Sequence, residues 1–515
     1  MKRQNRIVKM MAVALAALAA GLFIVGCERC TCSSSRLRDA GIADSSDTGS
    51  KAPETPDANR APEEPVEGVL RIYFLTLVEQ SDGTKEAPPR QGAMEGLIRA
   101  FNGDPRYSQV TVKSEFFGYE ELSKRIEHFT RPDLSEQERA EASPDLFVWF
   151  GGERMRGLKD QLRPLDHVWR DQDLDLHENM SSALSAVAVD GVPYGVPYTA
   201  DHWAIYYRTD FLAGKSPPED WEALLRLCED LQGQRKGLAP VAIGTKYSWP
   251  AVAWFDYLDL RINGADFHQK LMDGTAESDT DVARYDSQKV GRVLEVWGDM
   301  IRRGCFLRGH QRLSSEEVVS HVLRLDKAAM SLFGTKLTES IPAVELSNYG
   351  VFRFPTFSGE GRTGDEEATD CEVAVLEMFL SPRGARNPGA ADAFLAFAAS
   401  EPAQTAINKV LRQIPLHKKA RTISGDPFLA ESADIVHRAK GLVPLYDSNT
   451  HPDMVELAMV AFREFMLDPT PERQEEILRR LEEARKTIFE TARPGPTSSP
   501  LDAATPSSGA APGAP

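Results

Sequence analysis

Apolar runs of strand length alternate with helical spacing of apolar residues in the first part of the chain. Two strand-like runs, Leu70–Leu77 and Val110–Phe117, flank residues 94–101, where apolar side chains recur at i, i+3, i+4 and i+7. This order predicts a βαβ unit with parallel strands. The run Asp145–Phe150 then stops at two glycines, which is typical of a buried strand that ends at a crevice.

The same alternation continues through the rest of the chain. Predicted strands cover 328–333 and 373–380, and predicted helices cover 221–231, 390–399 and 472–489. The last helix is amphipathic and highly charged, which favours a solvated surface helix over a membrane binder. The predicted fold class is therefore α/β.

Both ends of the chain lack the pattern of a folded domain. Residues 1–26 contain four bases followed by an apolar run, 10–25, which is short for a membrane span and has the length of an export signal. Residues 27–66 carry few large apolar side chains and are expected to form a disordered tether, and residues 493–515 are a low-complexity tail. The 426 residues from 67 to 492 are enough for two domains.

The sequence Ile24–Cys27 resembles the lipobox of bacterial lipoproteins, in which a small apolar pair and a glycine precede a lipidated cysteine. This resemblance implies that Cys27 is the membrane anchor; an uncleaved signal anchor is the alternative. Cys30 and Cys32 lie in the tether and indicate little on their own. The remaining cysteines are read as small buried hydrophobic residues, with a disulfide left open: Cys228, Cys305 and Cys371.

Charge and motifs exclude several classes of function. The net charge is -17, and it becomes -21 without the four bases of residues 1–26, which disfavours nucleic acid or an anionic lipid surface as the main partner. The sequence contains no HExxH, GxSxG or GxxxxGK[ST] motif, and the glycine-rich stretch 358–364 is read as a loop. We therefore expect no catalysis, no metal and no cofactor, although a catalytic carboxylate pair distant in sequence stays open.

Several short segments together resemble an extracellular solute-binding protein of family 1, the carbohydrate-binding group of ABC importers that includes maltose-binding protein. They occur in the family's order over residues 67–490: Phe101–Leu122, Pro144–Trp149, Gly195–Tyr198 with Tyr206–Asp210, Asp220–Glu222, Trp249–Pro250, Met330–Gly334 and Ser381–Pro388. Each segment alone is a weak signal, whereas the ordered set is strong.

The resemblance implies a two-lobed periplasmic-binding-protein fold (type II), in which each lobe is a mixed sheet flanked by helices. The N-terminal lobe is expected to hold 67–200 and 357–420, and the C-terminal lobe 201–356 and 421–490. The chain would cross between lobes near 198–203, 354–361 and 420. Such proteins trap a solute by closing around a hinge, so the solute must contact both lobes.

The resemblance also implies a set of ligand-binding residues. Aromatic rings would stack on the C–H face of a sugar, and charged groups would bind its hydroxyls. The predicted ligand-binding residues are Trp149, Glu153, Arg154, Asp201, Trp203, Lys246, Tyr247, Lys336 and Glu377.

Other interpretations of these residues stay open at this point. Trp149 and Trp203 suit a core as well as a cleft, and Trp249 and Trp254 favour a core. Glu153 and Arg154 also fit a solvated loop pair. Glu377 interrupts an apolar run, so its carboxylate must reach a cleft, a partner or solvent.

Two departures from the family bear on the solute. Lys336 stands where many relatives have a stacking tryptophan, and the first strand runs into Leu75–Glu79 without the tryptophan often found there. Fewer rings and an extra cation suit a small or anionic solute, such as a sugar phosphate, nearly as well as a neutral oligosaccharide.

The sequence therefore predicts a monomeric, lipid-anchored substrate-binding protein in the cell envelope, which captures a carbohydrate or polyol and delivers it to ABC permease subunits. A sensory lipoprotein that presents its solute to a receptor is one alternative. A surface hydrolase acting on glycans is the other.

Overall fold

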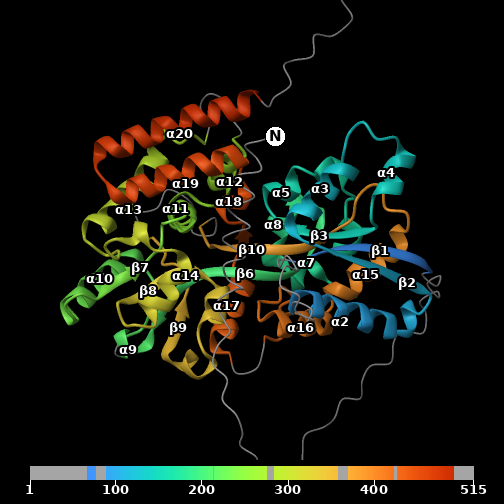
Figure 1. Ribbon diagram of the computed structural model, residues 1–515, viewed down its shortest axis with the longest axis horizontal. Coiled ribbons are helices and arrows are strands. Elements are labelled where there is room, and N and C mark those ends of the chain that lie inside the picture. The colour runs from blue at the N-terminus through green and yellow to red at the C-terminus, as the bar shows by residue number, and fades with distance from the viewer. Residues whose placement is uncertain are drawn as a thin grey trace, which may run out of the picture. The chain divides into compact units, whose positions relative to one another are not determined.

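The computed structural model describes residues 67–76, 89–212, 214–274, 283–357, 369–422 and 426–491 (Figure 1). The chain divides into two compact units, of which the first contains the residues up to Asp145 together with Gly384–Phe394. The second contains Leu146–Arg383 and the residues from Leu395 onward. The predicted lobe boundaries differ from this division and stay a prediction.

Several predictions fall outside the described residues. These are the export signal 1–26, the anchor Cys27 with Cys30 and Cys32, the tether 27–66, the glycine-rich loop 358–364 and the tail 493–515.

The first unit is built on a βαβ element. Strands β1 (Gly68–Leu75) and β2 (Val110–Phe117) pair in parallel, and α2 (Pro89–Gly103) connects them. Helices α3 (Tyr119–Phe129) and α4 (Glu136–Ala142) follow. The apolar side chains of β1 from Leu70 to Leu75 are buried, as the apolar run requires, and the parallel pairing with β2 confirms the βαβ prediction.

The side chain of Asp145 holds the end of the first unit together. Its Oδ2 accepts a hydrogen bond from the backbone N–H of Arg71 at 2.8 Å. Its Oδ1 accepts from the backbone N–H groups of Arg386 and Asn387, both at 2.8 Å. A buried carboxylate with three donors is well satisfied, and here it joins segments that are 241 residues apart.

The second unit contains a mixed sheet with β10 (Cys371–Leu380) at its centre. This strand pairs antiparallel with β3 (Leu146–Phe150) and with the first half of β6 (Gly195–Arg208), while the second half of β6 pairs antiparallel with β8 (Ala328–Gly334). The remaining strands are β7 (Ala239–Ala242) parallel to β8, β9 (Tyr349–Phe352) antiparallel to β6, β11 (Gly441–Val443) parallel to β10, and a hairpin of β4 (Ala188–Val189) and β5 (Val192–Pro193). The predicted strands 328–333 and 373–380 are thus confirmed.

The helices of the second unit surround a large apolar core. Helix α11 (Trp249–Asn263) is buried at every position from Pro250 onward. The other long helices are α10 (Trp221–Gln234), α12 (Ala265–Asp273), α13 (Gln288–Arg302), α15 (Pro388–Ala399, shared with the first unit), α16 (Glu401–Leu411), α17 (Pro427–Arg438), α19 (Pro452–Leu467) and α20 (Pro471–Thr491). The short helices are α5 (Glu153–Arg156), α6 (Asp166–Trp169), α7 (Leu176–Asn179), α8 (Leu184–Val187), α9 (Thr209–Leu212), α14 (Ser315–Glu317) and α18 (Tyr446–Asn449). The three described cysteines are buried free thiols, as expected.

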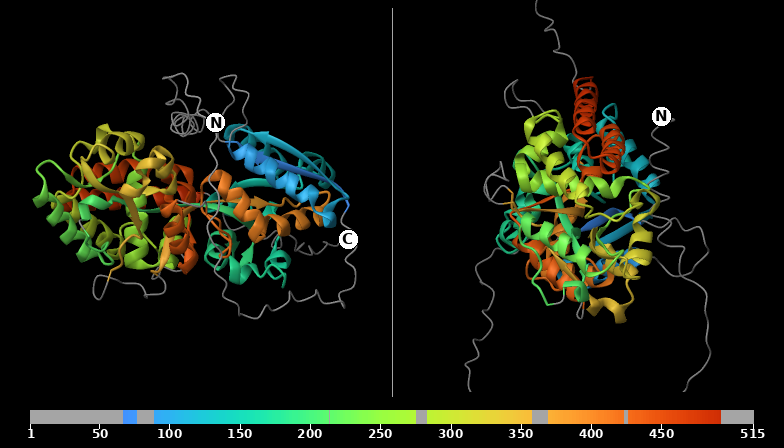
Figure 2. Two further views of the ribbon diagram at one scale, coloured as in Figure 1. Left: turned by 90° about the horizontal axis from the view of Figure 1, so that it is seen from below. Right: turned by 90° about the vertical axis from the view of Figure 1, so that its left-hand side faces the viewer.

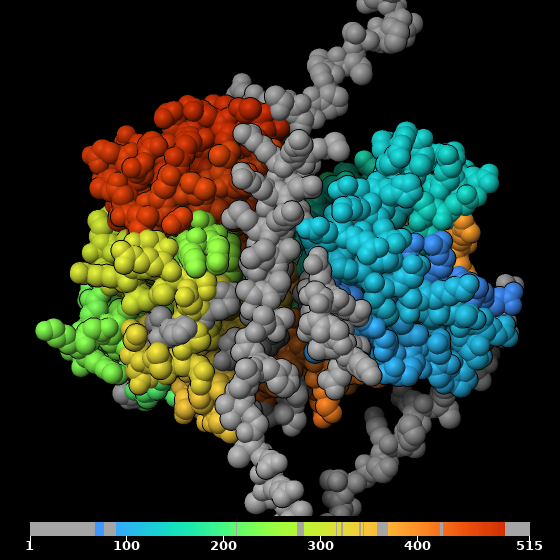
Figure 3. Space-filling model, viewed as in Figure 1, coloured from blue at the N-terminus to red at the C-terminus, as the bar shows by residue number. Residues whose placement is uncertain are grey.

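Helices α19 and α20 lie side by side, as the views of Figure 2 show. Ile477 and Leu481 of α20 are fully buried, and Glu482 and Arg485 are buried as an ion pair, while the other described charged side chains of the helix are partly or fully exposed. Figure 3 shows these two helices, in red, as part of the molecular surface. The prediction of a charged surface helix is confirmed.

A buried ion pair joins α11 to β10. The Arg261 guanidinium donates to Glu372 Oε1 at 2.7 Å, and both side chains are fully buried. Tyr257 donates to the other carboxylate oxygen at 2.9 Å. Burial opposes the charged form, yet Arg261 and its neighbours hold the pKa of Glu372 well below its usual range. The pair fixes the strand next to β6, where the candidate site begins.

Candidate functional site

The predicted ligand-binding residues all lie in the second unit, in two groups. The first group surrounds the middle of β6, the end of β8 and the loop before α11. The second surrounds the end of β3, helix α5 and β10.

Asp201 is the polar centre of the first group. It lies on β6, and its Oδ1 accepts hydrogen bonds from the Thr335 hydroxyl at 2.6 Å and from the Lys336 backbone N–H at 3.3 Å. A Cβ on Gly334 would lie 2.7 Å from the same oxygen, so the glycine at the end of β8 makes room for the carboxylate. None of the described residues donates a hydrogen bond to Asp201 Oδ2, which leaves an acceptor for another donor.

Trp203 forms an aromatic cluster two residues beyond Asp201, on the same face of β6. Its ring stacks on Phe333 at 5.7 Å between centroids and meets Trp249 edge to face at 5.5 Å. Trp203 is only 4% exposed, and its buried Nε1–H has no acceptor among the described residues. A buried donor without an acceptor costs about 1–3 kcal/mol, so an acceptor such as a water or a hydroxyl group would stabilise this N–H.

Lys246 and Tyr247 lie in the loop between β7 and α11, directly before Trp249. Both are exposed, and Lys246 Nζ lies 5.4 Å from the centroid of the Tyr247 ring. The backbone N–H of Lys246 is fixed by Leu313 O at 3.0 Å. The structure therefore places two long, exposed polar side chains on a backbone that a hydrogen bond holds in position.

The second group contains Trp149 and Glu377. Trp149 is 5% exposed and lies opposite Met378 in the β3–β10 ladder. Glu377 is buried, and the Tyr198 hydroxyl donates to its Oε2 at 2.6 Å. The sequence required a cleft, a partner or solvent for this carboxylate, and the structure shows a partner, Tyr198.

Glu153 and Arg154 begin helix α5, next to Arg156. Burial raises the pKa of Glu153, and the positive charge of Arg156 opposes this shift. Arg154 lies 5.2 Å from the Phe150 ring centroid. Arg156, which the sequence did not single out, donates to Asn449 on α18 and pairs with Asp273. Thr335, Gly334 and Phe333 were also missed as individual site residues.

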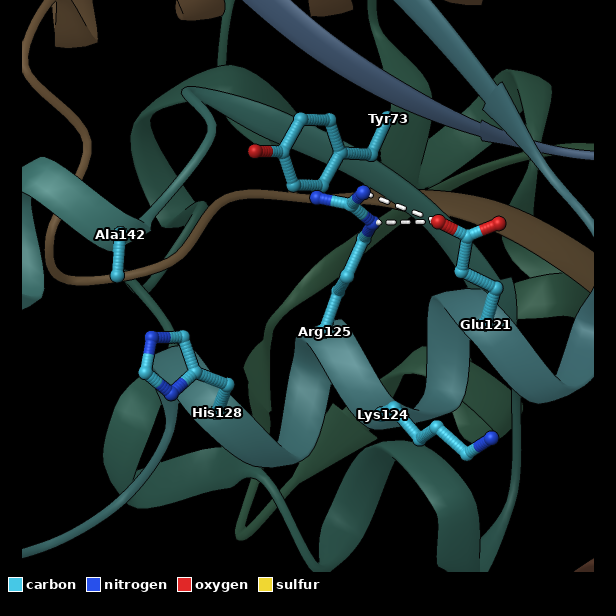
Figure 4. Close-up of a pocket in the computed structure, with 6 residues that line it drawn as sticks. All are labelled: Tyr73, Glu121, Lys124, Arg125, His128 and Ala142. Atoms are coloured by element: carbon cyan, nitrogen blue, oxygen red, sulfur yellow. Dashed lines mark hydrogen bonds and ion pairs between the residues drawn. The ribbon is translucent and has the colours of Figure 1, made fainter.

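The first unit has a pocket of its own, with a volume of about 290 Å³. Tyr73, Glu121, Lys124, Arg125, His128 and Ala142 line it (Figure 4). Arg125 points at Glu121, 3.0 Å away, and its guanidinium also lies over the Phe117 ring. None of the predicted ligand-binding residues lines this pocket.

Within the described part of the chain, no set of three or more His, Cys, Asp or Glu side chains is arranged to hold a metal ion. Across the same residues, no helix has both the length and the hydrophobicity that crossing a membrane requires.

Comparison with known proteins identifies the family. Residues 123–434 match the family of bacterial extracellular solute-binding proteins. The chain belongs to this family. Its members are binding proteins and not enzymes, so the resemblance and the expectation of a non-catalytic protein are confirmed, and an extracellular or envelope location follows.

Individual relatives support the same assignment. An uncharacterized ABC transporter extracellular-binding protein from Pyrococcus horikoshii is 23% identical over 62% of this chain and 68% of its own length.

Solved structures match the fold of this solute-binding protein. The bacterial solute receptor AcbH, described as having an exclusive preference for β-D-galactopyranose, has a TM-score of 0.69 at 23% identity, over 82% of this chain and 98% of its own. The sugar-binding protein MalE from Xanthomonas citri has a TM-score of 0.62 at 14% identity, over 82% and 99%. A probable secreted solute-binding lipoprotein from Streptomyces coelicolor has a TM-score of 0.64 at 17% identity, over 81% and 98%. The predicted fold class is confirmed.

Proposed function

We propose that this solute-binding protein captures a carbohydrate or related polyol by hinge closure and delivers it to the permease of an ABC importer. The two lobes would hold 67–200 with 357–420, and 201–356 with 421–490. To move an open–closed balance from 1:99 to 99:1, the solute must favour the closed form by roughly 5.5 kcal/mol, so it must contact both lobes.

The observation that carries this proposal is the pair of unused polar atoms on one face of β6. Asp201 Oδ2 is an acceptor and Trp203 Nε1–H is a donor, and neither has a partner among the described residues. A hydroxyl group donates one hydrogen bond and accepts another, so it satisfies both kinds of atom. Water would do so as well, but a polyol brings several hydroxyls at fixed spacing.

The surrounding aromatic rings support a sugar in particular. Trp249 is partly exposed beside Trp203, and Tyr247 is 40% exposed two residues earlier. Such rings can cover the C–H face of a pyranose, while Asp201 binds its hydroxyl edge. The neighbours named above include a receptor for β-D-galactopyranose and a sugar-binding MalE, which is consistent with this class of solute.

The charged side chains leave the choice between neutral and anionic solutes to experiment. The backbone N–H of Lys336 donates to Asp201, which puts this lysine beside the carboxylate in the chain's fold, and Lys246 is exposed in the loop before α11. A phosphate would bind two ammonium groups well, whereas Asp201 would repel it.

Binding to a panel of neutral sugars, polyols and their phosphates tests the proposal by thermal shift and calorimetry. We expect at least one solute to bind, with Asp201→Asn and Trp203→Phe each weakening it about tenfold or more, since each removes a hydrogen-bonding group. Asp210→Asn and Trp221→Phe are matched controls in the same unit. The proposal fails if no member of the panel binds, or if the controls weaken binding as much as the site variants.

We further propose that Cys27 is lipidated and anchors the protein to the membrane. The lipobox resemblance supports this, as does the match to a probable secreted lipoprotein. Mass spectrometry of the N-terminal peptide should show a diacylglyceryl-modified cysteine, and Cys27→Ser should release the protein from the membrane fraction. An unmodified thiol at Cys27 in the wild-type protein would contradict the anchor.

A further inference from the structure

Cys228 and Cys305 are two buried thiols that the proposed function does not use. Cys228 lies on α10, between Leu224 and Leu231 on the buried face of that helix, and Cys305 follows α13. Both cysteine side chains are fully buried in the same apolar cluster of the second unit. Since a cysteine often serves as a small hydrophobic residue, burial alone assigns no role to either thiol.

Two side chains of α10 bind the chain directly before Cys305. The Gln232 side-chain amide donates to the backbone oxygen of Arg303 at 3.0 Å, across 71 residues of sequence. The Arg303 guanidinium donates to Glu229 Oε1 at 2.8 Å, across 74 residues. Glu229 directly follows Cys228, and Arg303 lies two residues before the second cysteine. These contacts hold the part of α10 that carries Cys228 against the segment that carries Cys305.

The backbone of Cys305 is also fixed by β7. Its carbonyl oxygen accepts a hydrogen bond from the Val241 N–H at 2.9 Å, and its own N–H donates to Met300 O at 3.3 Å. Phe306, the next residue, forms a parallel bridge with Val241, and α10 packs against β7. Cys305 therefore lies beside the strand that α10 packs on, and the surface contacts are not its only connection to that helix.

The two thiol groups are themselves neighbours. A hydrogen bond with the Cys305 thiol, together with burial, raises the pKa of the Cys228 thiol well above its usual range. Such a bond requires the two sulfur atoms to face each other in the core. Two cysteines whose side chains point at one another are what a disulfide needs.

The location of the family bears on how such a pair is interpreted. Disulfides form and persist in extracellular and periplasmic compartments, whereas thiols of cytosolic proteins are kept reduced. An extracellular solute-binding protein completes its folding in the oxidising setting. A pair of facing cysteines in its core is therefore placed to become a crosslink.

We propose that Cys228 and Cys305 form a disulfide in the exported protein, which links α10 to the segment after α13. The oxidant is a protein or small molecule that carries a disulfide of its own. One cysteine thiolate attacks a sulfur of the oxidant, releases the other sulfur as a thiolate and leaves a mixed disulfide. The second cysteine thiolate then attacks the first cysteine's sulfur and releases the remaining oxidant thiolate. The two cysteines lose two protons and two electrons, and the oxidant's disulfide becomes two thiols.

Burial determines when this reaction takes place. The thiolate is the reactive form, and a fully buried thiol with a raised pKa supplies little of it and is out of reach of an oxidant. The bond therefore forms while the chain folds after export, and once formed it is protected from reductants in the same way. A chain that folds in a reducing cytosol keeps both thiols.

The first measurement is a thiol map of the full-length protein isolated from the cell envelope. The protein is unfolded in denaturant with iodoacetamide and without reductant, and its peptides are analysed by mass spectrometry. We expect the peptides that contain Cys228 and Cys305 to be linked, with the loss of two hydrogen atoms. Cys371, a buried thiol on β10, is the internal control and should be alkylated.

The second measurement is the melting temperature of the same protein after unfolding and refolding, with and without dithiothreitol. The disulfide would close a loop longer than the 71 residues that separate Gln232 from Arg303, and a long loop restricts the unfolded chain most. We expect the oxidised protein to melt about 5 °C or more above the reduced one. The double variant Cys228→Ala with Cys305→Ala should lose this difference, whereas Cys371→Ala should keep it.

The proposal is overturned if both cysteines of the envelope protein are alkylated, if either is linked to a different cysteine, or if dithiothreitol leaves the wild-type melting temperature unchanged. If the double variant does not fold, the wild type and Cys371→Ala decide by themselves. Neither measurement uses a solute, so failure of the disulfide leaves the sugar-binding proposal standing, and failure of the sugar panel leaves both measurements intact.

Discussion

Replacement of Asp256 by asparagine should change how the stability of this protein depends on pH. Asp256 is fully buried on α11, with Oδ2 bound to the Tyr446 backbone N–H and Oδ1 only 3.6 Å from His268 Nε2. Neither Oδ1 nor Nε2 has a hydrogen-bond partner among the described residues. Because His268 Nδ1 is bound to Asp259, these two facing atoms suit a single shared proton.

The size of the effect follows from the pKa values. Burial raises the pKa of Asp256 from 3.8 to about 7, against the opposing charge of His268. Burial disfavours the charged form of His268, but Asp259 and Asp256 outweigh it and raise the pKa of the imidazole. A group whose pKa is raised on folding adds stability below its unfolded pKa, and this stability is lost as pH rises through the folded value. For Asp256 the loss between about pH 4 and pH 8 is up to about 4 kcal/mol.

Asparagine keeps the acceptor for Tyr446 and cannot ionise, so it should escape this loss. Urea unfolding followed by tryptophan fluorescence at pH 5 and pH 8 gives the free energy of unfolding of both proteins. We expect the free energy of unfolding of Asp256→Asn to rise relative to that of the wild type as the pH rises, by several kcal/mol at pH 8. Asp266→Asn, an exposed change on α12, is the control and should show no such trend. A wild-type minus variant difference that is the same at both pH values would refute the reasoning.

Two other substitutions test contacts around the site. Gly334→Ala should push the Asp201 carboxylate away from the Thr335 hydroxyl and destabilise the protein by about 1–3 kcal/mol. Gly233→Ala in α10 is the control: its Cβ would meet nothing within 4 Å, so it should be neutral or stabilising. Equal effects of the two variants in urea unfolding would argue against the close approach of Gly334 to Asp201. Glu372→Gln leaves a buried arginine uncompensated and should cost about 3–5 kcal/mol by the same assay, and a loss below about 1 kcal/mol would contradict a buried charge pair.

Most of the strands that the sequence predicts have a continuous apolar run, and β2, with polar residues at 113–115, is the exception. Strands β3, β8 and β10 are buried on both faces, as is β1 from Ile72 onward, so their composition alone marks them. Strands β7 and β9 have four residues each and were not predicted, because so short a segment is a strand only through its neighbours. Strand β6 has polar residues such as Asp201 and His202 within it, and only the family resemblance pointed to its course.

The candidate site divides in the same way. Asp201 and Trp203 could be proposed from the sequence, because Asp201 matches a carboxylate that contacts sugar in the family that the chain resembles, and Trp203 lies two positions further on. The Thr335 hydroxyl and Arg156 could not, because their roles depend on partners 134 and 293 residues away. Arg156 is one of two arginines in a four-residue helix, and nothing in the local pattern distinguishes it from Arg154.

The segments that carried the resemblance are each weak signals, yet the structure shows why they occur together. Asp145, in the segment Pro144–Trp149, accepts hydrogen bonds from the backbone of Arg386 and Asn387, in the segment Ser381–Pro388. The buried carboxylate therefore depends on the turn that the second segment forms. Gly334 ends another segment, and its missing Cβ leaves the space for Asp201, which lies on β6 three residues beyond the segment Gly195–Tyr198. A change at one position of such a pair is costly without a change at the other, because a buried carboxylate loses its donors or meets an atom in its place. An ordered set of short segments is therefore stronger than its parts for a physical reason: its members are contacts of one fold, read along the chain.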